Sequence, residues 1–168
     1  FSQDCEHVDR DSIRSFLGHL KYPLYYLDYE TIGPAIPLFD ETKAYDQIPF
    51  QFSLHVQREE CGELEHFGYL HKTTEDPRKS VASALIDLCG DEGSVVVYNQ
   101  SFEESCNNKM AAVLPEYKEG LLQINERMVD LLIPFRNRWL YHPNQAGSAS
   151  IKSVLPAFSS FSYDSMSI

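Results

Sequence analysis

Patterns of apolar and polar residues predict four strands. In "FQFSLHVQ", residues 50–57, every second residue is apolar, as in a strand with one buried face. A Gly-containing turn separates it from "LEHFGYL", residues 64–70, and the two segments together predict a hairpin. The aromatic run "PLYYLDYE", residues 23–30, has strand composition, and the β-branched run "SVVVYN", residues 94–99, predicts a central buried strand.

Apolar residues at helical spacing predict helices at 9–20, 75–90 and 100–115, and a turn with a short helix at 147–158. Residues 124–141 fit a helix, although "RMVDLLI" within them is also typical of a strand. The order helix, strand, hairpin, helix, strand, helix predicts a mixed sheet, a hairpin beside parallel strands, flanked by helices. We expect an α/β fold in a single domain over residues 1–168.

Two of the predicted helices begin at recognisable caps. Asp76 is placed to cap one helix, with Pro77 at its first helical position and Gly90 at its end. Ser101 and Glu104 have the spacing of a capping box for the next helix. Glu104 therefore has a structural explanation from the sequence alone.

The net charge of −11 argues against broad, non-specific adhesion to nucleic-acid phosphates, which needs clustered Lys and Arg. Residues 131–168 carry one acid and three basic residues, a net charge of +2, so the rest of the chain carries −13. This mildly basic segment could hold a nucleic acid locally, or it could arise by chance.

Membrane insertion and secretion are not expected from this sequence. No apolar run approaches the roughly 18–20 residues of a membrane-spanning helix, and the N-terminus lacks the features of a secretory signal. The four cysteines are widely spaced without a CxxC pair, as expected for reduced thiols in a cytoplasmic protein. Since the chain begins without Met, we expect a piece of a longer protein.

The segment "DYE" places two acids at the end of an apolar, aromatic strand. Side chains alternate between the faces of a strand, so Asp28 and Glu30 point to the same side and Tyr29 to the other. Carboxylates at this spacing repel each other, and a divalent cation with a preference for oxygen ligands compensates the repulsion. The alternative is a pair of acids at a solvated strand end.

A third acid, Glu103, follows the buried strand at 94–99. It does not fill the role of the capping box, which belongs to Glu104. Its structural alternative is the favourable interaction of a first-turn acid with the helix dipole. Two strands of one sheet that both end in acids would bring Glu103 near Asp28 and Glu30.

The motifs around these acids resemble a known family. "YYLDYETI" followed by "VVYNQSFE" is similar to the first two motifs of the DnaQ-like (DEDD) 3′–5′ exonucleases, which have the ribonuclease H-like fold. From "YPLYYLDYETIGPAIP" to "YHPNQAGSASIKSVLPAF" the chain also resembles an uncharacterised bacterial domain family. In that family the domain often follows a Cas4-like nuclease region in a longer protein.

The resemblance implies that Asp28, Glu30 and Glu103 are catalytic metal ligands. They would bind two Mg²⁺ or Mn²⁺ ions, which activate a water and stabilise the leaving oxygen of a phosphodiester. Glu103 stands where most DnaQ-like exonucleases have Asp, so its longer side chain alters the coordination distance, although the bacterial family uses Glu.

Four further residues are implied as substrate-binding residues. Asn99 and Phe102 match the second motif, Asp130 matches the acid of "RMVDLL", and Lys152 matches a position that could contact phosphate. The structural alternatives are a turn-forming Asn, a core Phe, an acid on a helix surface and a solvated Lys at a helix end.

The third motif of the exonucleases, a final Asp at a fixed distance after Tyr or His, is missing. Ser167 stands four residues after Tyr163, and Gly147 stands five residues after His142, so neither position supplies the acid. We expect the last metal ligand and the general base to lie beyond residue 168. The domain is then C-terminally truncated and inactive, or nearly so, by itself.

We therefore expect a metal-dependent exonuclease domain that acts on DNA or RNA 3′ ends in the bacterial cytoplasm. The alternative is a non-catalytic binding or scaffolding module that keeps the exonuclease-like fold and presents nucleic acid to a partner nuclease. A glycosidase with paired acids is disfavoured, because Asp28 and Glu30 on one strand face suit a shared ion better than the two sides of a sugar.

Overall fold

The computed structural model describes residues 5–161, which form two compact units. The larger unit is Lys21–Val129, and the smaller unit combines the chain up to Leu20 with the chain from Asp130 onward. The single domain expected over residues 1–168 stays a prediction. Within residues 5–161, no helix has the length and apolar character needed to cross a membrane.

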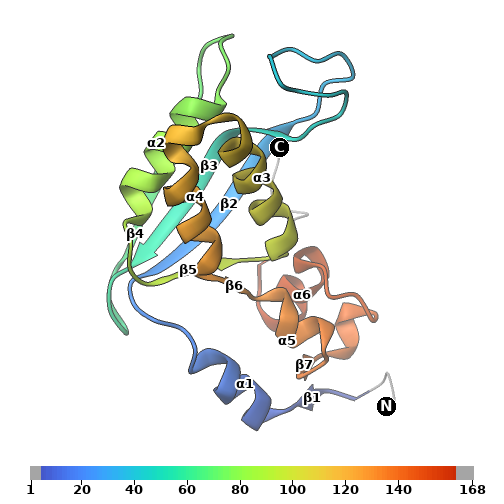
Figure 1. The fold of residues 1–168 in the computed structure, drawn as a ribbon. Coiled ribbons are helices and arrows are strands. Elements are labelled where there is room, and N and C mark those ends of the chain that lie inside the picture. The colour runs from blue at the N-terminus through green and yellow to red at the C-terminus, as the bar shows by residue number, and fades with distance from the viewer. Residues whose placement is uncertain (1–4, 162–168) are drawn as a thin grey trace. The chain divides into compact units, whose positions relative to one another are not determined.

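A five-stranded mixed sheet is the framework of the larger unit (Figure 1). Its strands are β2 (Leu24–Ile32), β3 (Ile48–Gln57), β4 (Leu64–Leu70), β5 (Ser94–Val97) and β6 (Met128–Asp130), in the spatial order β4-β3-β2-β5-β6. β3 pairs antiparallel with both β2 and β4, whereas β2 pairs parallel with β5. The predicted hairpin beside parallel strands is confirmed.

Helices cover one face of this sheet. They are α2 (Arg78–Cys89), α3 (Gln100–Val113) and α4 (Lys118–Glu126), and Figure 1 shows them together on the same side. The 3₁₀ turn η1 (Pro115–Tyr117) joins α3 to α4. Side chains that point to this side from the strands, such as Leu27, Phe52 and Val95, are almost completely buried. A mixed α/β fold with helices flanking the sheet is thus confirmed.

The other face of β2, β3 and β4 is polar and is here called the polar face. It carries Asp28, Glu30, Ser53, His55 and His66, because residues that alternate with the core positions point away from the helices. The predicted candidate acids of β2 therefore lie on this side of the sheet.

α4 was not predicted from the sequence, and Gly120 explains both its omission and its position. Glycine weakens a helix by roughly 1 kcal/mol relative to alanine, so it argues against a helix. In the structure, a Cβ at Gly120 would lie only 2.9 Å from Cδ1 and 3.1 Å from Cγ2 of Ile86 on α2. The missing side chain lets α4 approach α2 closely.

The predicted start of α2 is displaced by one residue. Pro77 is the N-cap residue and not the first helical residue. Asp76 still performs the expected role, since its Oδ1 accepts the Arg78 backbone N–H at 3.0 Å. The guanidinium of Arg78, which is 8% exposed, also donates to Asp76 and to the Asp40 carbonyl.

The predicted capping box of α3 is wrong. The helix begins at Gln100, so Ser101 already lies in the first turn and cannot be the N-cap. Asn99 is the N-cap residue, in a left-handed conformation with φ of 81°. Asn tolerates this conformation better than most residues. The N-cap therefore lies two residues closer to the N-terminus than the capping box implied, whereas the helix itself begins at Gln100 as predicted.

Arg127 ties the end of α2 to the segment before β6. Its guanidinium donates to the backbone carbonyls of Gly90, at 2.7 Å, of Glu92, and of Cys89. One side chain thus satisfies several carbonyls that the end of a helix leaves without partners in the helix.

The smaller unit contains short elements from both ends of the chain. They are β1 (His7–Val8), α1 (Arg10–Leu17), α5 (Leu132–Arg136), β7 (Leu140–Tyr141), the 3₁₀ turn η2 (Pro143–Gln145) and α6 (Ile151–Phe158). β1 and β7 pair antiparallel, and Phe16 packs edge-to-face on Trp139 at 6.2 Å. The ambiguous segment 124–141 proves to hold the end of α4, then β6, α5 and β7.

Candidate functional site

Asp28 and Glu30 are both exposed on the polar face of β2, as the alternation predicted. Leu27 and Tyr29, which alternate with them, are each 4% exposed and belong to the core. Although the Asp28 side chain is exposed, neighbouring protein atoms partly desolvate its carboxylate, and this desolvation and, second, the charge of Glu30 raise the pKa of Asp28 above its ordinary value. The two carboxylates are therefore close enough to repel, and a shared cation would relieve that repulsion.

An irregularity in the sheet follows the acid pair directly. Asp28 stands opposite Ser53 and Glu30 opposite Gln51, but the register between β2 and β3 shifts between Glu30 and Thr31. Such bulges bend a strand and re-aim its side chains, and they are frequent next to active sites.

Glu103 lies in the first turn of α3 and is only 3% exposed. Burial and, second, the charge of Glu103 raise the pKa of the Cys106 thiol to about 12. Burial raises the pKa of Tyr29 well above its ordinary value. The neighbouring Cys106 and Cys89 thiols and then the Glu103 charge raise the pKa of Tyr29 further. Glu103 thus acts on Tyr29, whose side chain leaves β2 on the side opposite to Asp28.

The strand register brings the start of α3 to the same end of the sheet as the acid pair. Tyr26 of β2 pairs with Val96 of β5, so β5 ends level with Leu27. α3 begins three residues after Val97, at the end of the sheet where Asp28 and Glu30 lie. Within residues 5–161, however, no three or more His, Cys, Asp or Glu side chains gather closely enough to hold a metal ion. A joint metal site of Glu103 with the pair stays a prediction.

Asn99 and Phe102 have the structural roles that the sequence allowed. Asn99 forms the left-handed N-cap of α3, and Phe102 is half-buried against the core cluster. A contact of either residue with a substrate stays a prediction.

Asp130 and Lys152 belong to the smaller unit. Asp130 is 7% exposed at the end of β6, and its Oδ1 accepts the Leu132 backbone N–H at 2.9 Å. The alternative of an acid on a helix surface is therefore wrong. Lys152 is exposed in the first turn of α6.

The residues compared with the third exonuclease motif have different fates. Tyr163 and Ser167 lie outside the described residues. His142 is the N-cap of η2. Its ring Nδ1 accepts the Asn144 backbone N–H at 3.1 Å, and the His142 backbone N–H donates to Gln145 Oε1 at 2.7 Å. This capping accounts for the structural role of His142.

A hollow of about 440 Å³ begins at Ile32, just beyond the acid pair on β2. Its lining combines apolar side chains with two threonines, a histidine and an acid: Ile32, Leu38, Phe39, Phe50, His71, Thr73, Thr74, Glu75 and Pro77. Mixed linings of this kind hold the organic part of a ligand while polar groups fix its orientation.

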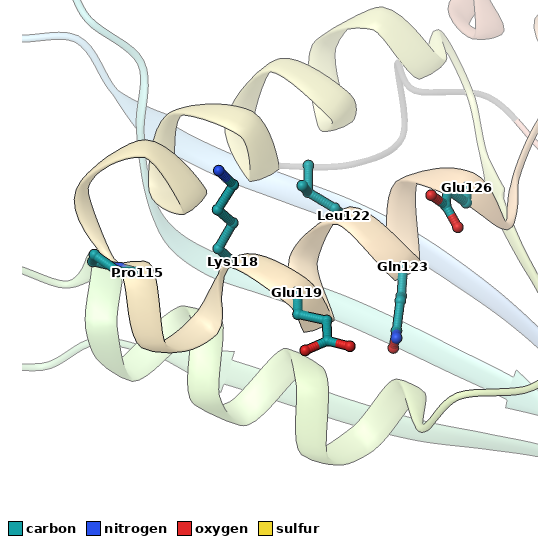
Figure 2. Close-up of a pocket in the computed structure, with 6 residues that line it drawn as sticks. All are labelled: Pro115, Lys118, Glu119, Leu122, Gln123 and Glu126. Atoms are coloured by element: carbon teal, nitrogen blue, oxygen red, sulfur yellow. The ribbon is translucent and has the colours of Figure 1, made fainter.

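A second hollow, of about 520 Å³, runs along the surface of α4 (Figure 2). Pro115, Lys118, Glu119, Leu122, Gln123 and Glu126 line it, and they come from one stretch of chain. Its lining contains none of the predicted site residues, so it adds nothing to the candidate site.

The sequence did not single out three other polar-face residues. Ser53 Oγ and His66 Nε2 are 3.0 Å apart, and the rings of His55 and His66 stack with centroids 4.3 Å apart. The alternation in "FQFSLHVQ" already placed Ser53 and His55 on the polar side of a strand. Their partnership with His66 depends on the register of the hairpin, which the sequence pattern did not give.

Residues 25–150 match the family described as "Domain of unknown function (DUF2779)". The uncharacterized protein MG366 of Mycoplasma genitalium is 32% identical over 147 residues, 81% of this chain and 22% of that protein. Its homolog in Mycoplasma pneumoniae is 33% identical over 158 residues, 87% of this chain and 24% of that protein.

A third relative, the uncharacterized protein UU173 of Ureaplasma parvum, is 30% identical over 148 residues, 82% of this chain and 21% of that protein. The chain therefore spans less than a quarter of the length of these relatives. No solved structure matches it. Because the family match covers most of the chain and the whole of the sheet apart from the first residue of β2, this protein belongs to the DUF2779 family.

Proposed function

We propose that this chain is a metal-dependent 3′–5′ exonuclease domain of the DnaQ-like type, on a ribonuclease H-like fold. The observation that carries the proposal is the pair Asp28–Glu30 on one strand face, where desolvation and, second, the charge of Glu30 raise the pKa of Asp28. The mixed sheet supports it, since a hairpin beside parallel strands is what the resemblance implies.

The residues present fit part of a metal site. Asp28 and Glu30 offer the hard oxygen ligands that Mg²⁺ and Mn²⁺ prefer. When bound, such ions lower the pKa of a water nucleophile and neutralise charge on a phosphodiester. Glu103, at the start of the helix after the neighbouring parallel strand, is the third proposed ligand.

The remaining parts of the proposal concern the whole protein. We place the last acid and the general base in sequence that follows residue 168. We also place a Cas4-like nuclease region in the same polypeptide, and the length of the relatives leaves room for both. The hollow that begins at Ile32 would receive the terminal nucleoside of a DNA or RNA 3′ end.

The test uses the longer protein that carries this chain and an oligonucleotide labelled at its 5′ end. We expect Mn²⁺-dependent shortening from the 3′ end, and a loss of at least about 100-fold in Asp28→Asn, because the metal ligand is removed. The matched control is Asp87→Asn, an exposed acid on α2, which should retain full activity. Full activity of Asp28→Asn would eliminate the proposal.

A metal titration of the 168-residue chain separates the nuclease from the non-catalytic module. Ligand binding to the folded state raises the melting temperature by mass action. Mn²⁺ should therefore stabilise the wild type and not Asp28→Asn. Nucleic-acid binding without a metal response and without hydrolysis would favour the non-catalytic module.

A further inference from the structure

Side chains on the polar face form rows across three strands. In one row, Asp28 of β2, Ser53 of β3 and Gly68 of β4 stand opposite one another. Adjacent strands lie about 4.8 Å apart, so Ser53 on the middle strand is one strand spacing from Asp28 and one strand spacing from Gly68. This row therefore forms a short lane over the polar face, which runs from Asp28 across Ser53 to Gly68 on the edge strand β4.

The next row holds Tyr26, His55 and His66. The two imidazole rings stack with an interplanar angle of 23°, and His66 Nε2 reaches back to Ser53 Oγ at 3.0 Å. With the proton on Nε2, His66 donates to the Ser53 oxygen, which leaves the Ser53 hydroxyl hydrogen as a donor to a third group. Stacking on His55 restrains the ring that makes this contact.

Gly68 has no conformational or steric reason to be glycine. Its φ lies outside the left-handed range, and a Cβ there would meet only His66 Cε1, at 3.8 Å, an ordinary contact. Glycine weakens a strand, and within a sheet it often marks a place where a ligand approaches the backbone closely. Its missing side chain keeps the lane beside Ser53 open.

The charged side chains of the polar face determine which groups can hold a ligand there. Asp28 and Glu30 are its acids, and His55 and His66 are the side chains in β2, β3 and β4 that can carry a positive charge on this side. An anion that contacts the protein beside the carboxylates must therefore be held by hydroxyl and imidazole donors. Phosphate oxygens in protein complexes accept hydrogen bonds from such side chains.

We propose that Ser53 and His66 bind a backbone phosphate of the nucleic-acid strand whose 3′ end lies at Asp28 and Glu30. This inference rests on the proposed function and adds the path of the substrate. Ser53 donates to a non-bridging oxygen, His66 orients the hydroxyl, and Gly68 admits the sugar–phosphate backbone. The contact positions the strand without reading its sequence.

The test measures binding in the Asp28→Asn background, where hydrolysis should not interfere. The probe is a fluorescein-labelled oligodeoxythymidylate of about ten nucleotides, a single strand that offers both phosphates and bases for contact. The readout is fluorescence anisotropy. Adding Gly68→Val should weaken binding by about tenfold or more, the equivalent of one lost charge-assisted contact. Its melting temperature should be equal or higher, because valine favours strands.

Ser53→Ala and His66→Ala should weaken binding in the same way. The matched control is Leu64→Ala, which changes an exposed side chain, 57% accessible, on the same strand and the same face. It lies two residues from His66 on the side away from Gly68, so affinity should be unchanged.

Competition identifies the group that is bound. Inorganic phosphate should displace the probe from the Asp28→Asn chain and should compete less well once Ser53→Ala is added. Displacement by thymidine alone, and not by phosphate, would overturn the phosphate contact in favour of base stacking on the histidines. Unchanged probe affinity in a folded Gly68→Val variant would also overturn it.

The two proposals fail in different ways. If Asp28→Asn abolishes hydrolysis but Gly68→Val, Ser53→Ala and His66→Ala bind normally, the inference is wrong and the exonuclease proposal stands. If Asp28→Asn hydrolyses normally, the exonuclease proposal fails whatever the binding data show, and this inference fails with it.

Discussion

The Tyr29 hydroxyl donates a hydrogen bond to Asn107 Oδ1 at 2.7 Å, and both side chains are buried. Asn107 in turn donates to Asn125 Oδ1 at 2.7 Å, so a series of hydrogen bonds that begins in the core and reaches the half-buried Asn125 links β2, α3 and α4. These hydrogen bonds lie on the helix side of β2, opposite to the side that carries Asp28 and Glu30.

Tyr29→Phe removes the donor and leaves the Asn107 oxygen buried without it. The aromatic packing on Phe52, at 6.5 Å, is retained. We expect a loss of about 1–3 kcal/mol in the free energy of unfolding, the cost of a buried polar atom deprived of its partner. Urea denaturation measures it, with Tyr45→Phe as the control because that side chain is 70% exposed. Equal stability of wild type and Tyr29→Phe would contradict the role of this hydrogen bond.

Asp28→Asn should stabilise the protein in a pH-dependent way when a chelator removes divalent ions. Burial and Glu30 raise the pKa of Asp28 above 3.8, so its favourable contribution is complete below that pH and is lost as pH rises through the folded-state pKa. We expect the variant to be more stable than wild type at pH 7, by at most about 1 kcal/mol for a screened charge, and no more stable at pH 3.

Thermal melts at both pH values check this expectation. Asp87→Asn is again the matched control and should show no such crossover. A destabilised Asp28→Asn at pH 7 without metal would mean that a cation-independent contact holds the Asp28 carboxylate.

Gly120 and Ile86 should be energetically coupled. Gly120→Ala gains helix propensity, about 1 kcal/mol, but places a Cβ within 2.9 Å of the Ile86 side chain. In an Ile86→Ala background the same substitution meets no such obstacle. A double-mutant cycle should therefore give a coupling of about 1 kcal/mol or more, in favour of the double variant. Additive effects would show that α4 can shift away from α2 without cost.

Two of the four thiols should react with an alkylating reagent in the folded protein, and the other two should be protected. Cys5 and Cys61 are exposed, whereas burial raises the pKa of Cys89 and of Cys106 to about 12. At pH 8, iodoacetamide should modify two cysteines in the folded chain and all four in denaturant, as counted by mass spectrometry.

The same pKa values predict alkaline destabilisation. Between pH 9 and about 12 the two buried thiols stay neutral in the folded protein and ionise in the unfolded chain. Their contribution to stability is complete below pH 9 and is lost as pH rises through that range. Cys106→Ala should reduce this part of the pH dependence.

The strands were predictable because one face of each is buried. The alternation in β3 and β4 gave their positions within two residues, and the β-branched composition of β5 gave its buried, interior place between β2 and β6. α4 escaped prediction because its Gly120 is selected by a tertiary contact with Ile86, which overrides helix propensity. The start of α3 at Gln100 agrees with the predicted range, but its capping box was wrong because Asn99 forms the N-cap in a left-handed conformation that the capping pattern does not encode.

The candidate site was predictable only as far as local periodicity reaches. Alternation alone put Asp28 and Glu30 on one side of β2. The burial of Glu103 depends on the packing of α3, and the contact between Ser53 and His66 depends on hairpin register. Both are properties of the assembled sheet and leave no mark in a single segment of sequence.

Arg127 couples the local stability of two segments that lie far apart in the sequence. Its guanidinium serves the carbonyls at the end of α2, while its own carbonyl accepts the Val95 N–H of β5 at 2.9 Å. If either segment opens, the other loses partners at the same moment. In native-state deuterium exchange we expect amides at 88–95 and 127–129 to become labelled together, with one opening free energy, and Arg127→Ala to lower that energy for both.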